Sequence, residues 1–566
     1  MSANQESPQP PNAMTDRFHT VSTRILDALL EDAPEWASEL GDHRFADRLS
    51  DNSADADARR AGVLTDALGA LDEIDDALLP AADQVDLEML RSRVSADLWR
   101  LTELRPHTWN PLAQLPGDAL YGLIARDTLD LGERLRLLAA RCAAVPDYLA
   151  DARRRLDDGP GMPRVHVETA AAQADGVAAM LSGEVDALLV QEPGMRSAVG
   201  PARDAALRAV GEHAEWLRSR IDGATADPRL GARAYGAQLW YELDSELSPD
   251  TLLTRAESDL LGAEEEIAEA AAEYDGAPRY PGQVRDVLDR IATEYATTPE
   301  TLEPLCRDAY AHLLARIEET DFATMPDQPV RIIPMPESRR GVATAYCDPP
   351  GPLSPKTGEP TLIAVAPPPA DWPTERRRSF HREYNGAMLR NLMVHEGLPG
   401  HALQLGHAAG YKGATKVRHA LWSGTFIEGW AVYAEDALAR RGWCEEGTTD
   451  NRTLRLVQLK MRLRMILNAI LDVRTHSGGM TGAEAMALLM ERGHQEEGEA
   501  AGKWRRAQLT SAQLSTYYVG YREVADIARD LSEARPRARR RELHDAMLAH
   551  GSPSPRHLRT LLGLTG

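Results

Sequence analysis

Cysteine is scarce in this chain. Only four cysteines occur among 566 residues, at positions 142, 306, 347 and 444, and no two of them form a C-x-x-C pair. Disulfide-stapled domains and thiolate metal sites need cysteines at closer and more regular spacing. The sequence therefore argues against a disulfide framework and against a metal site built from thiolates.

Long apolar runs and an excess of positive charge are also missing. No segment approaches 18 uninterrupted apolar residues, and the first 20 residues are polar, without the apolar core of a secretory signal. The net charge of −23 at pH 7 opposes binding to nucleic acid or anionic membrane, because both are negatively charged. We expect a cytoplasmic protein without nucleic-acid or membrane partners, and its oligomeric state stays open.

Helical periodicity dominates what is present. Apolar residues make up 43% of the chain, enough for a sizeable core. From Leu87 to Leu101 they recur at spacings of three and four, the pattern of an amphipathic helix. Similar patterns cover 128–156, 166–190, 203–221, 250–274, 284–316 and 452–473, whereas 330–333 and 361–365 read as strands.

The segment from His395 to His401 reads H-E-G-L-P-G-H and carries the clearest chemical signal. Two imidazoles flank a carboxylate, Glu396, which together are the ligands and the general base of a zinc hydrolase. Histidines six residues apart lie about 240° apart on an ideal helix, so they can share a metal ion only where the helix is broken. Gly397, Pro399 and Gly400 suit such a break, because glycine accepts unusual backbone angles and proline lacks an N–H.

A third ligand is expected downstream. A zinc site with two histidines usually takes one more protein ligand and keeps a fourth position for water. Glu428 lies 27 residues after His401, in a segment that reads as a helix, and is the candidate. Glu435 lies seven residues further along on the same helix face, where it either orients a ligand or forms a simple salt bridge.

Two runs, H-E-G-L-P-G-H-A-L-Q and F-I-E-G-W-A-V-Y-A-E, resemble the bacterial family of domain of unknown function 885. Segments at 39–45, 472–476 and 517–520 resemble the same family, so the resemblance covers most of the chain. That family is placed near the gluzincin metallopeptidases, distantly similar to thimet oligopeptidase and angiotensin-converting enzyme. The resemblance implies a mainly α, large bilobed helical zincin-like fold with a small β-sheet beside the active-site helix.

Two positions depart from the family pattern. Ala402 stands where a second histidine is usual, and Tyr521 stands where lysine is common. We expect the first departure to leave the metal ligands intact and the second to bear on the choice of substrate.

The predicted domain organisation follows from a change after residue 325, where helical periodicity gives way to segments that read as strands. We predict a disordered N-terminus over 1–15, a helical half over 16–325 that covers the cleft, and a catalytic half over 326–566. The predicted strands lie just upstream of the metal motif, where zincins typically carry a small sheet whose edge strand pairs with the substrate backbone.

Further site residues are expected near the C-terminus. An oxyanion needs a hydrogen-bond donor besides the metal, and tyrosine hydroxyls serve this purpose in related gluzincins. Tyr517 and Tyr518 are the candidates, with Tyr518 favoured because it lies nearer Gly520, and His476 is a further donor candidate or a helix cap.

Substrate contacts are expected from three more residues. Arg522 or Arg474 could bind a substrate carboxylate with two parallel hydrogen bonds, although helical arginines are usually solvated. Tyr346 is expected to line the cleft.

The predicted function is a Zn²⁺-dependent hydrolase that cleaves amide or peptide bonds of short peptides, with Glu396 as the general base. An amidohydrolase for one small metabolite, biosynthetic or detoxifying, is the alternative. A catalytically silent binding protein is the third reading, and the intact Glu396 argues against it, because a binder has no need of a base there.

Overall fold

The structure is a computed structural model that describes residues 13–335, 345–354, 358–369, 372–441 and 449–564. The fold is mainly α, as the sequence predicts. The first twelve α-helices are α1 (Ala13–Asp32), α2 (Pro34–Glu39), α3 (Ala54–Asp72), α4 (Ala81–Trp99), α5 (Gly117–Ala125), α6 (Leu131–Asp157), α7 (Arg164–Gln191), α8 (Arg196–Arg220), α9 (Ala232–Leu243), α10 (Pro249–Asp275), α11 (Gln283–Glu294) and α12 (Pro299–Thr320). After the strands follow α13 (Thr374–Glu383), α14 (Gly386–Glu396), α15 (His401–Gly410), α16 (Val417–Ala420), α17 (Gly424–Ala439), α18 (Thr449–His476), α19 (Gly482–Ala487), α20 (Glu497–Leu509), α21 (Ser515–Ala534), α22 (Arg540–Leu548) and α23 (Pro555–Leu562).

The predicted helix over 284–316 is divided into α11 and α12. The break comes from the local sequence at Thr298 and Pro299. The Thr301 hydroxyl accepts a hydrogen bond from the Thr298 N–H at 2.9 Å, and Pro299 follows at the first helical position. A capped start with proline at its first position begins a new helix and does not continue the previous one.

Three short strands form one mixed sheet in the described part of the chain. The strands β1 (Val330–Pro334) and β3 (Thr361–Val365) pair in parallel, and β2 (Ala345–Asp348) pairs with β3 in antiparallel fashion. The order is β1-β3-β2, so β2 is an edge strand, and it packs against α14. The sequence predicts β1 and β3 but not β2, whose four residues are too few to show an alternating pattern.

The buried cores do not divide at residue 325. One core joins α5 to α8, and a smaller one joins α1, α3 and α4. The largest core contains side chains from α9 to α12 together with those of the sheet and the helices from α14 onward. The packing therefore places α9–α12 with the C-terminal half, although these helices precede the predicted boundary.

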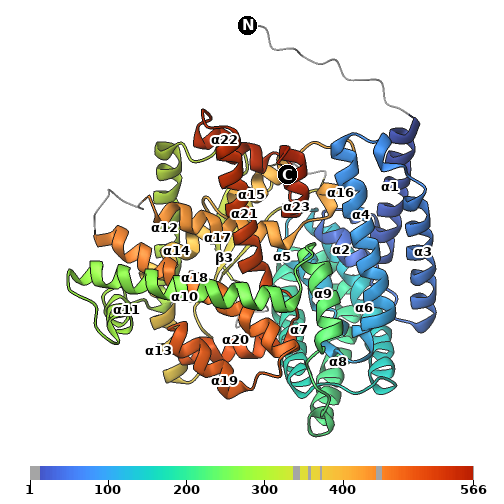
Figure 1. Cartoon of the computed structure of the whole chain (residues 1–566). Helices are drawn as coiled ribbons and strands as arrows, with labels where there is room; N and C mark the ends of the chain where they lie inside the picture. Colours follow the sequence, from blue (N-terminus) through green and yellow to red (C-terminus); the bar gives the residue numbers. More distant parts are fainter. Residues whose placement is uncertain (1–12, 336–344, 355–357, 370–371, 442–448, 565–566) are drawn as a thin grey trace.

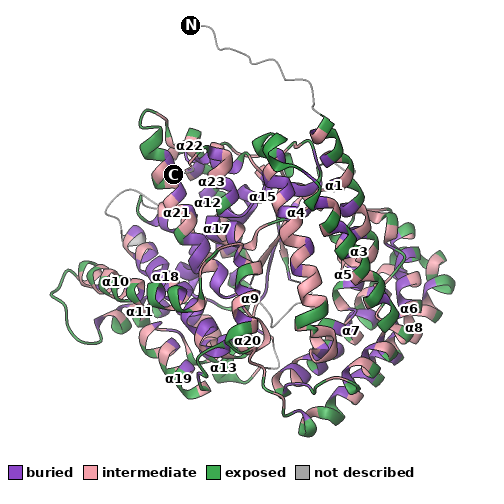
Figure 2. Cartoon of the chain, turned by 45° about the vertical axis from the view of Figure 1, so that its right-hand side comes forward, coloured by how far each residue is buried: buried purple, intermediate pink, exposed green. Residues whose placement is uncertain are grey.

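Figure 1 shows the same arrangement in space. The blue and cyan helices α1, α3, α4, α6 and α8 gather on one side, and the orange and red helices α17 to α21 lie on the other. Figure 2 shows α17 and α18 mostly buried near the middle, while α3, α6 and α8 expose their outer faces. The segment that carries the metal motif is therefore held inside a packed helical layer.

The N-terminal helix α1 begins within the segment that the sequence predicts to be disordered. Residues 1–12 of the predicted disordered N-terminus lie outside the described residues, but Ala13 to Thr15 belong to α1, so the predicted boundary at residue 15 is wrong. Within the described ranges, no helix combines the length and the apolar character needed to cross a membrane.

Candidate metal centre

The helix breaks between the two motif histidines, as their spacing predicts. The helix α14 ends at Glu396 and α15 begins at His401. The Gly400 N–H folds back to the Val394 carbonyl oxygen at 3.0 Å, and an added Cβ on Gly400 would overlap the carbonyl oxygens of His395 and Val394. Only glycine fits at this position, because any side chain would collide with the end of α14.

The turn between the helices is fixed from outside as well. The Leu398–Pro399 peptide bond is cis, and the Trp430 indole N–H donates to the Pro399 carbonyl oxygen at 2.8 Å. Trp430 is fully buried on α17, two residues after Glu428. The same helix that brings the expected third ligand therefore also holds the loop that separates the two histidines.

Three ligand atoms converge at this point. Glu428 Oε2 lies 3.3 Å from His395 Nε2 and 3.5 Å from His401 Nε2. Four-coordinate zinc with bonds of about 2.0–2.1 Å separates neighbouring ligand atoms by about 3.3–3.4 Å. Glu428 Oε2 is buried and accepts no hydrogen bond within the described structure, so it has an unused acceptor position aimed at both imidazoles. The donor set and its spacing therefore fit a zinc ion.

The second carboxylate on α17 supports the first histidine. Glu435 Oε1 lies 2.7 Å from His395 Nδ1, and Glu435 Oε2 accepts a hydrogen bond from Asn391 Nδ2 at 2.6 Å. With Nδ1 engaged by the carboxylate, the Nε2 of His395 is left to face Glu428. Asn391 lies one helical turn before His395, and its position on α14 aligns Glu435 with the imidazole.

Opposing charges dominate the electrostatics of the three ligands. Burial alone would lower the pKa of His395, but the carboxylates of Glu428 and Glu435 outweigh it and raise that pKa well above its usual value. Burial would raise the pKa of Glu428, but its contacts with His395 and His401 hold it far below the usual range. Glu428 is therefore ionised at neutral pH, as a metal ligand must be.

Glu396 is buried beside the ligands and next to the edge strand. It is 8% exposed, and the backbone N–H of Cys347 on β2 hydrogen-bonds to its carboxylate. Burial raises the pKa of Glu396, whereas the imidazoles of His401 and His395 and the Cys347 N–H oppose that rise. A carboxylate with a raised pKa, held next to a metal site, is suited to accept a proton from water.

The two C-terminal tyrosines point to different surroundings. The Tyr518 hydroxyl donates to Asp259 Oδ2 on α10 at 2.7 Å, and its side chain is buried. Burial raises the pKa of Tyr517, and the negative charge of Glu428 raises it further. Tyr518 is therefore engaged by an acid on α10, whereas the Tyr517 hydroxyl accepts hydrogen bonds from Arg506 at 3.3 Å and from Gln513 at 3.5 Å.

His476 does not join the metal centre. Its Nε2–H is shared between the carbonyl oxygens of Ala507 and Thr510, both at 2.9 Å, and its Nδ1 accepts from the Leu230 N–H at 3.4 Å. Its ring stacks on Tyr235 with a centroid separation of 5.3 Å. Both ring nitrogens are thus occupied by backbone groups, so His476 connects the end of α18 to its neighbours and has no free nitrogen for an oxyanion.

The two predicted carboxylate-binding arginines are already paired with acids. Arg474 forms an ion pair with Glu257, and Arg522 lies 3.4 Å from Asp259. Both acids belong to α10, so these arginines attach that helix to α18 and α21. An arginine that is paired with an acid must exchange partners before it can bind a substrate carboxylate.

The hydroxyls of Tyr346 and Tyr521 are both engaged by other side chains. Tyr346 lies on β2, next to Cys347, and its hydroxyl is 2.9 Å from that of Tyr121 on α5. The Tyr521 hydroxyl accepts a hydrogen bond from Arg462 and donates one to Asp436 Oδ2 at 3.2 Å. Tyr521 thus belongs to a buried charged network between α17, α18 and α21, and these contacts give no support to the expected effect on substrate choice.

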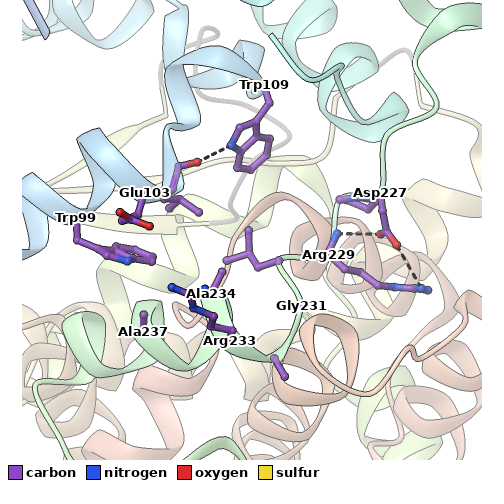
Figure 3. Close-up of a pocket in the computed structure, with 13 residues that line it drawn as sticks. Trp99, Glu103, Trp109, Asp227, Arg229, Gly231, Arg233, Ala234 and Ala237 are labelled. Carbon is purple, nitrogen blue, oxygen red and sulfur yellow. Dashed lines mark hydrogen bonds and ion pairs between the residues drawn. The ribbon is translucent and has the colours of Figure 1, made fainter.

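A separate cavity of about 620 Å³ lies between the C-terminal end of α4 and the start of α9. Figure 3 shows Trp99 and Glu103 on one wall and Arg233 on another, with Trp109 above them. Leu230 also lines this cavity. Because its N–H is the donor to His476, that histidine supports the cavity wall rather than the metal centre.

Sequence reasoning missed several residues that build the centre. Asn391 was not singled out, although its position one turn before His395 places it on the same helix face. The contribution of Cys347 comes from its backbone N–H, which leaves no signal in residue types. Arg506, which donates to the Tyr517 hydroxyl at 3.3 Å, lies in a segment without a recognisable motif.

Solved structures with the same architecture exist. A "putative lipoprotein of unknown function" from Shewanella oneidensis is 24% identical, with a TM-score of 0.79 over 96% of this chain and 99% of that chain. A "putative lipoprotein" from Colwellia psychrerythraea is 15% identical, with a TM-score of 0.79 over 98% and 99%. At these identities the likeness shows the fold alone.

A more distant likeness is to the M32 carboxypeptidase from Deinococcus radiodurans R1, at 11% identity and a TM-score of 0.41 over 97% of this chain and 94% of that chain. That score is too low to carry an argument about function. Among curated proteins, no sequence matches the chain significantly. The family model described as "Bacterial protein of unknown function (DUF885)" matches residues 34–562, and the chain belongs to that family.

Proposed function

We propose that this protein is a zinc-dependent hydrolase of amide or peptide bonds in short peptides. The observation that carries the proposal is the meeting of His395, His401 and Glu428 at 3.3 and 3.5 Å, with Glu396 buried beside them. A binding protein without turnover would not need a buried carboxylate next to the metal ligands, because such a group is costly to bury.

The chain's own residues supply the remaining chemistry. When bound, zinc would act as a Lewis acid that polarises the substrate carbonyl and activates water. In our proposal Glu396 accepts a proton as the water oxygen joins the acyl carbon, and it then passes that proton to the departing amine as the C–N bond breaks. Tyr517 stands on α21, which packs against α17, the helix of Glu428, and in our proposal its hydroxyl donates to the oxyanion.

The edge strand favours an extended peptide over a compact metabolite as the substrate. The strand β2 lies at the edge of the sheet, and it packs against α14, which ends at Glu396. On an edge strand every second residue directs its backbone N–H and C=O away from the partner strand. A peptide in extended conformation can pair with such an edge and bring one amide bond to Glu396.

One experiment tests the proposal directly. The purified protein, with and without added zinc, is incubated with a mixture of short peptides, and the products are identified by mass spectrometry. We expect cleavage that a chelator abolishes, that zinc restores, and that Glu396→Gln lacks. Zinc-loaded protein that cleaves no peptide but hydrolyses a small amide would support the metabolite amidohydrolase instead.

A further inference from the structure

Two cations lie on one face of α20, beside the proposed active centre. Lys503 and Arg506 are three residues apart, so both project from the same side of the helix. Lys503 is only 5% exposed, and Arg506 is partly buried. Arg506 donates to Gln513 Oε1 at 2.7 Å and to the Tyr517 hydroxyl at 3.3 Å, which are both neutral acceptors.

Neither cation has an acidic partner at ion-pair distance among the residues that the structure describes. The acids whose charges act on Lys503 are Glu499 and Glu383, and both are engaged by other cations. Glu499 pairs with Arg464, and Glu383 accepts from Lys460 Nζ at 2.8 Å.

The surroundings therefore hold more positive charge than negative charge. Burial and the neighbouring Arg464 and Arg506 lower the pKa of the Lys503 ammonium well below its usual value. A buried cation without a counter-charge destabilises a protein, so its presence points to an anion that arrives from outside.

The position of this pair relative to the metal ligands is defined by one side chain. The Tyr517 hydroxyl accepts a hydrogen bond from Arg506 at 3.3 Å, and Tyr517 lies one turn before Gly520, whose backbone touches that of Gly429, next to Glu428. Tyr517 therefore connects the cationic face of α20 to the helix crossing beside the proposed metal ligand. The other two candidate arginines, Arg474 and Arg522, are paired with acids on α10.

We propose that Arg506 and Lys503 form a binding subsite for the terminal carboxylate of the substrate. A guanidinium matches a carboxylate with two parallel hydrogen bonds, and the ammonium of Lys503 completes the neutralisation. The protein would then cleave at the carboxyl end of short peptides, because the subsite lies next to the scissile position. This inference rests on the proposed hydrolase function and adds the substrate class to it.

The test compares peptides that differ only in their last group. N-acetylated tetrapeptides are offered as free acids and as amides, and kcat/KM is measured for each. We expect the kcat/KM of the wild-type protein to be about 10- to 100-fold higher for the free acid, which is the factor that one hydrogen bond to a charged group contributes. Arg506→Ala should reduce that preference toward one. Arg505→Ala should keep it, because Arg505 is half exposed and lies against Glu168 at 3.3 Å.

A second measurement separates binding from structural support. Lys503→Met should raise the thermal unfolding temperature, because it removes an unpaired buried charge, and should reduce the preference for free acids. A lysine that only stabilises the fold would lower the unfolding temperature when replaced, and that result would contradict the subsite.

Substrate binding can also be measured in the absence of turnover. Calorimetry with the Glu396→Gln protein should show about 10-fold or more tighter binding of the free acid than of the amide. Equal hydrolysis and equal binding of both forms would overturn the carboxylate subsite and leave the hydrolase proposal intact. Absence of any zinc-dependent hydrolysis, with the preference in binding retained, would overturn the hydrolase proposal and leave the anion subsite.

Discussion

The backbones of Gly429 on α17 and Gly520 on α21 touch where the two helices cross. A Cβ added to Gly520 would lie 2.9 Å from Gly429 Cα and would overlap the Thr425 carbonyl oxygen. Glu428 is the neighbour of the first glycine, and Tyr517 lies one turn before the second. The close crossing therefore sets the distance between the proposed metal ligand and the proposed oxyanion donor.

Gly520→Ala is expected to destabilise the protein by at least about 1–3 kcal/mol, the usual effect of overpacking a buried contact. Because the collision is with backbone atoms, no side chain can rotate to relieve it. The thermal unfolding temperature measures this effect. Gly502→Ala on α20 is the matched control, because no atom lies within 4 Å of its added Cβ. The control should leave the unfolding temperature unchanged or raise it, since alanine favours helix. Equal melting of both variants would show that the crossing tolerates a methyl group.

Zinc content tests the ligand assignment. The purified protein should carry about one zinc ion per chain, and His395→Ala should lose it, because a site with one histidine and one carboxylate binds zinc weakly. Elemental analysis after dialysis gives the ratio. His407→Ala, on the same helix as His401 but bonded to the Thr324 carbonyl oxygen at 2.7 Å, should retain the metal. Undiminished zinc in the His395 variant would reject this centre.

Glu435→Ala should weaken zinc binding by about 10- to 100-fold without abolishing it, as expected for a residue that orients a ligand from behind. The carboxylate would no longer hold the Nδ1 of His395, now 2.7 Å away, and Asn391 would lose its acceptor. Competition with a chelator of known affinity measures the change. An unchanged affinity would reduce the Glu435 contact to a simple structural bridge.

Glu396→Gln should keep the zinc and the fold yet lose most of the activity, because a neutral amide cannot accept the proton of water. Zinc content and circular dichroism establish that the variant is intact, and kcat on a cleavable peptide establishes the loss. A kcat close to that of the wild-type protein would remove Glu396 from the proposed mechanism.

Tyr517→Phe should lower kcat and kcat/KM together by about 10²–10³, since the lost hydrogen bond is made mainly in the transition state. Tyr518→Phe removes the hydrogen bond to Asp259 at 2.7 Å and should act chiefly on stability. Steady-state kinetics of both variants on one peptide compare them. A larger loss of kcat in the Tyr518 variant would reverse this assignment and restore the preference from sequence.

Local patterns were enough for much of the architecture and for the metal motif. Amphipathic periodicity marks α4, α6, α7, α8, α10 and α18, because a helix that packs on a core repeats its apolar residues at 3.6 positions. The glycines and proline after Glu396 predict the break between the histidines, since their backbone preferences act within a few residues.

The remaining decisions depend on contacts between distant segments. Periodicity could not show that α9–α12 pack with the C-terminal half, because an apolar stripe shows that a helix is buried but not which helix it packs against. Nor could residue type show that Arg474 and Arg522 face acids on α10 while Arg506 faces Tyr517. An arginine's role is set by the charge that lies opposite it, and that charge comes from another helix.

The sequence by itself determined several of the long helices, the broken turn and the identity of the residues that could hold a metal ion, because these follow from local backbone preferences and donor chemistry. Only the tertiary structure decided that His395, His401 and Glu428 meet, that Tyr518 is bonded to Asp259, and that His476 is held elsewhere. The reason is geometric, because ligand atoms must come within a few ångströms of one another. That distance is set by how helices cross, as at Gly429 and Gly520.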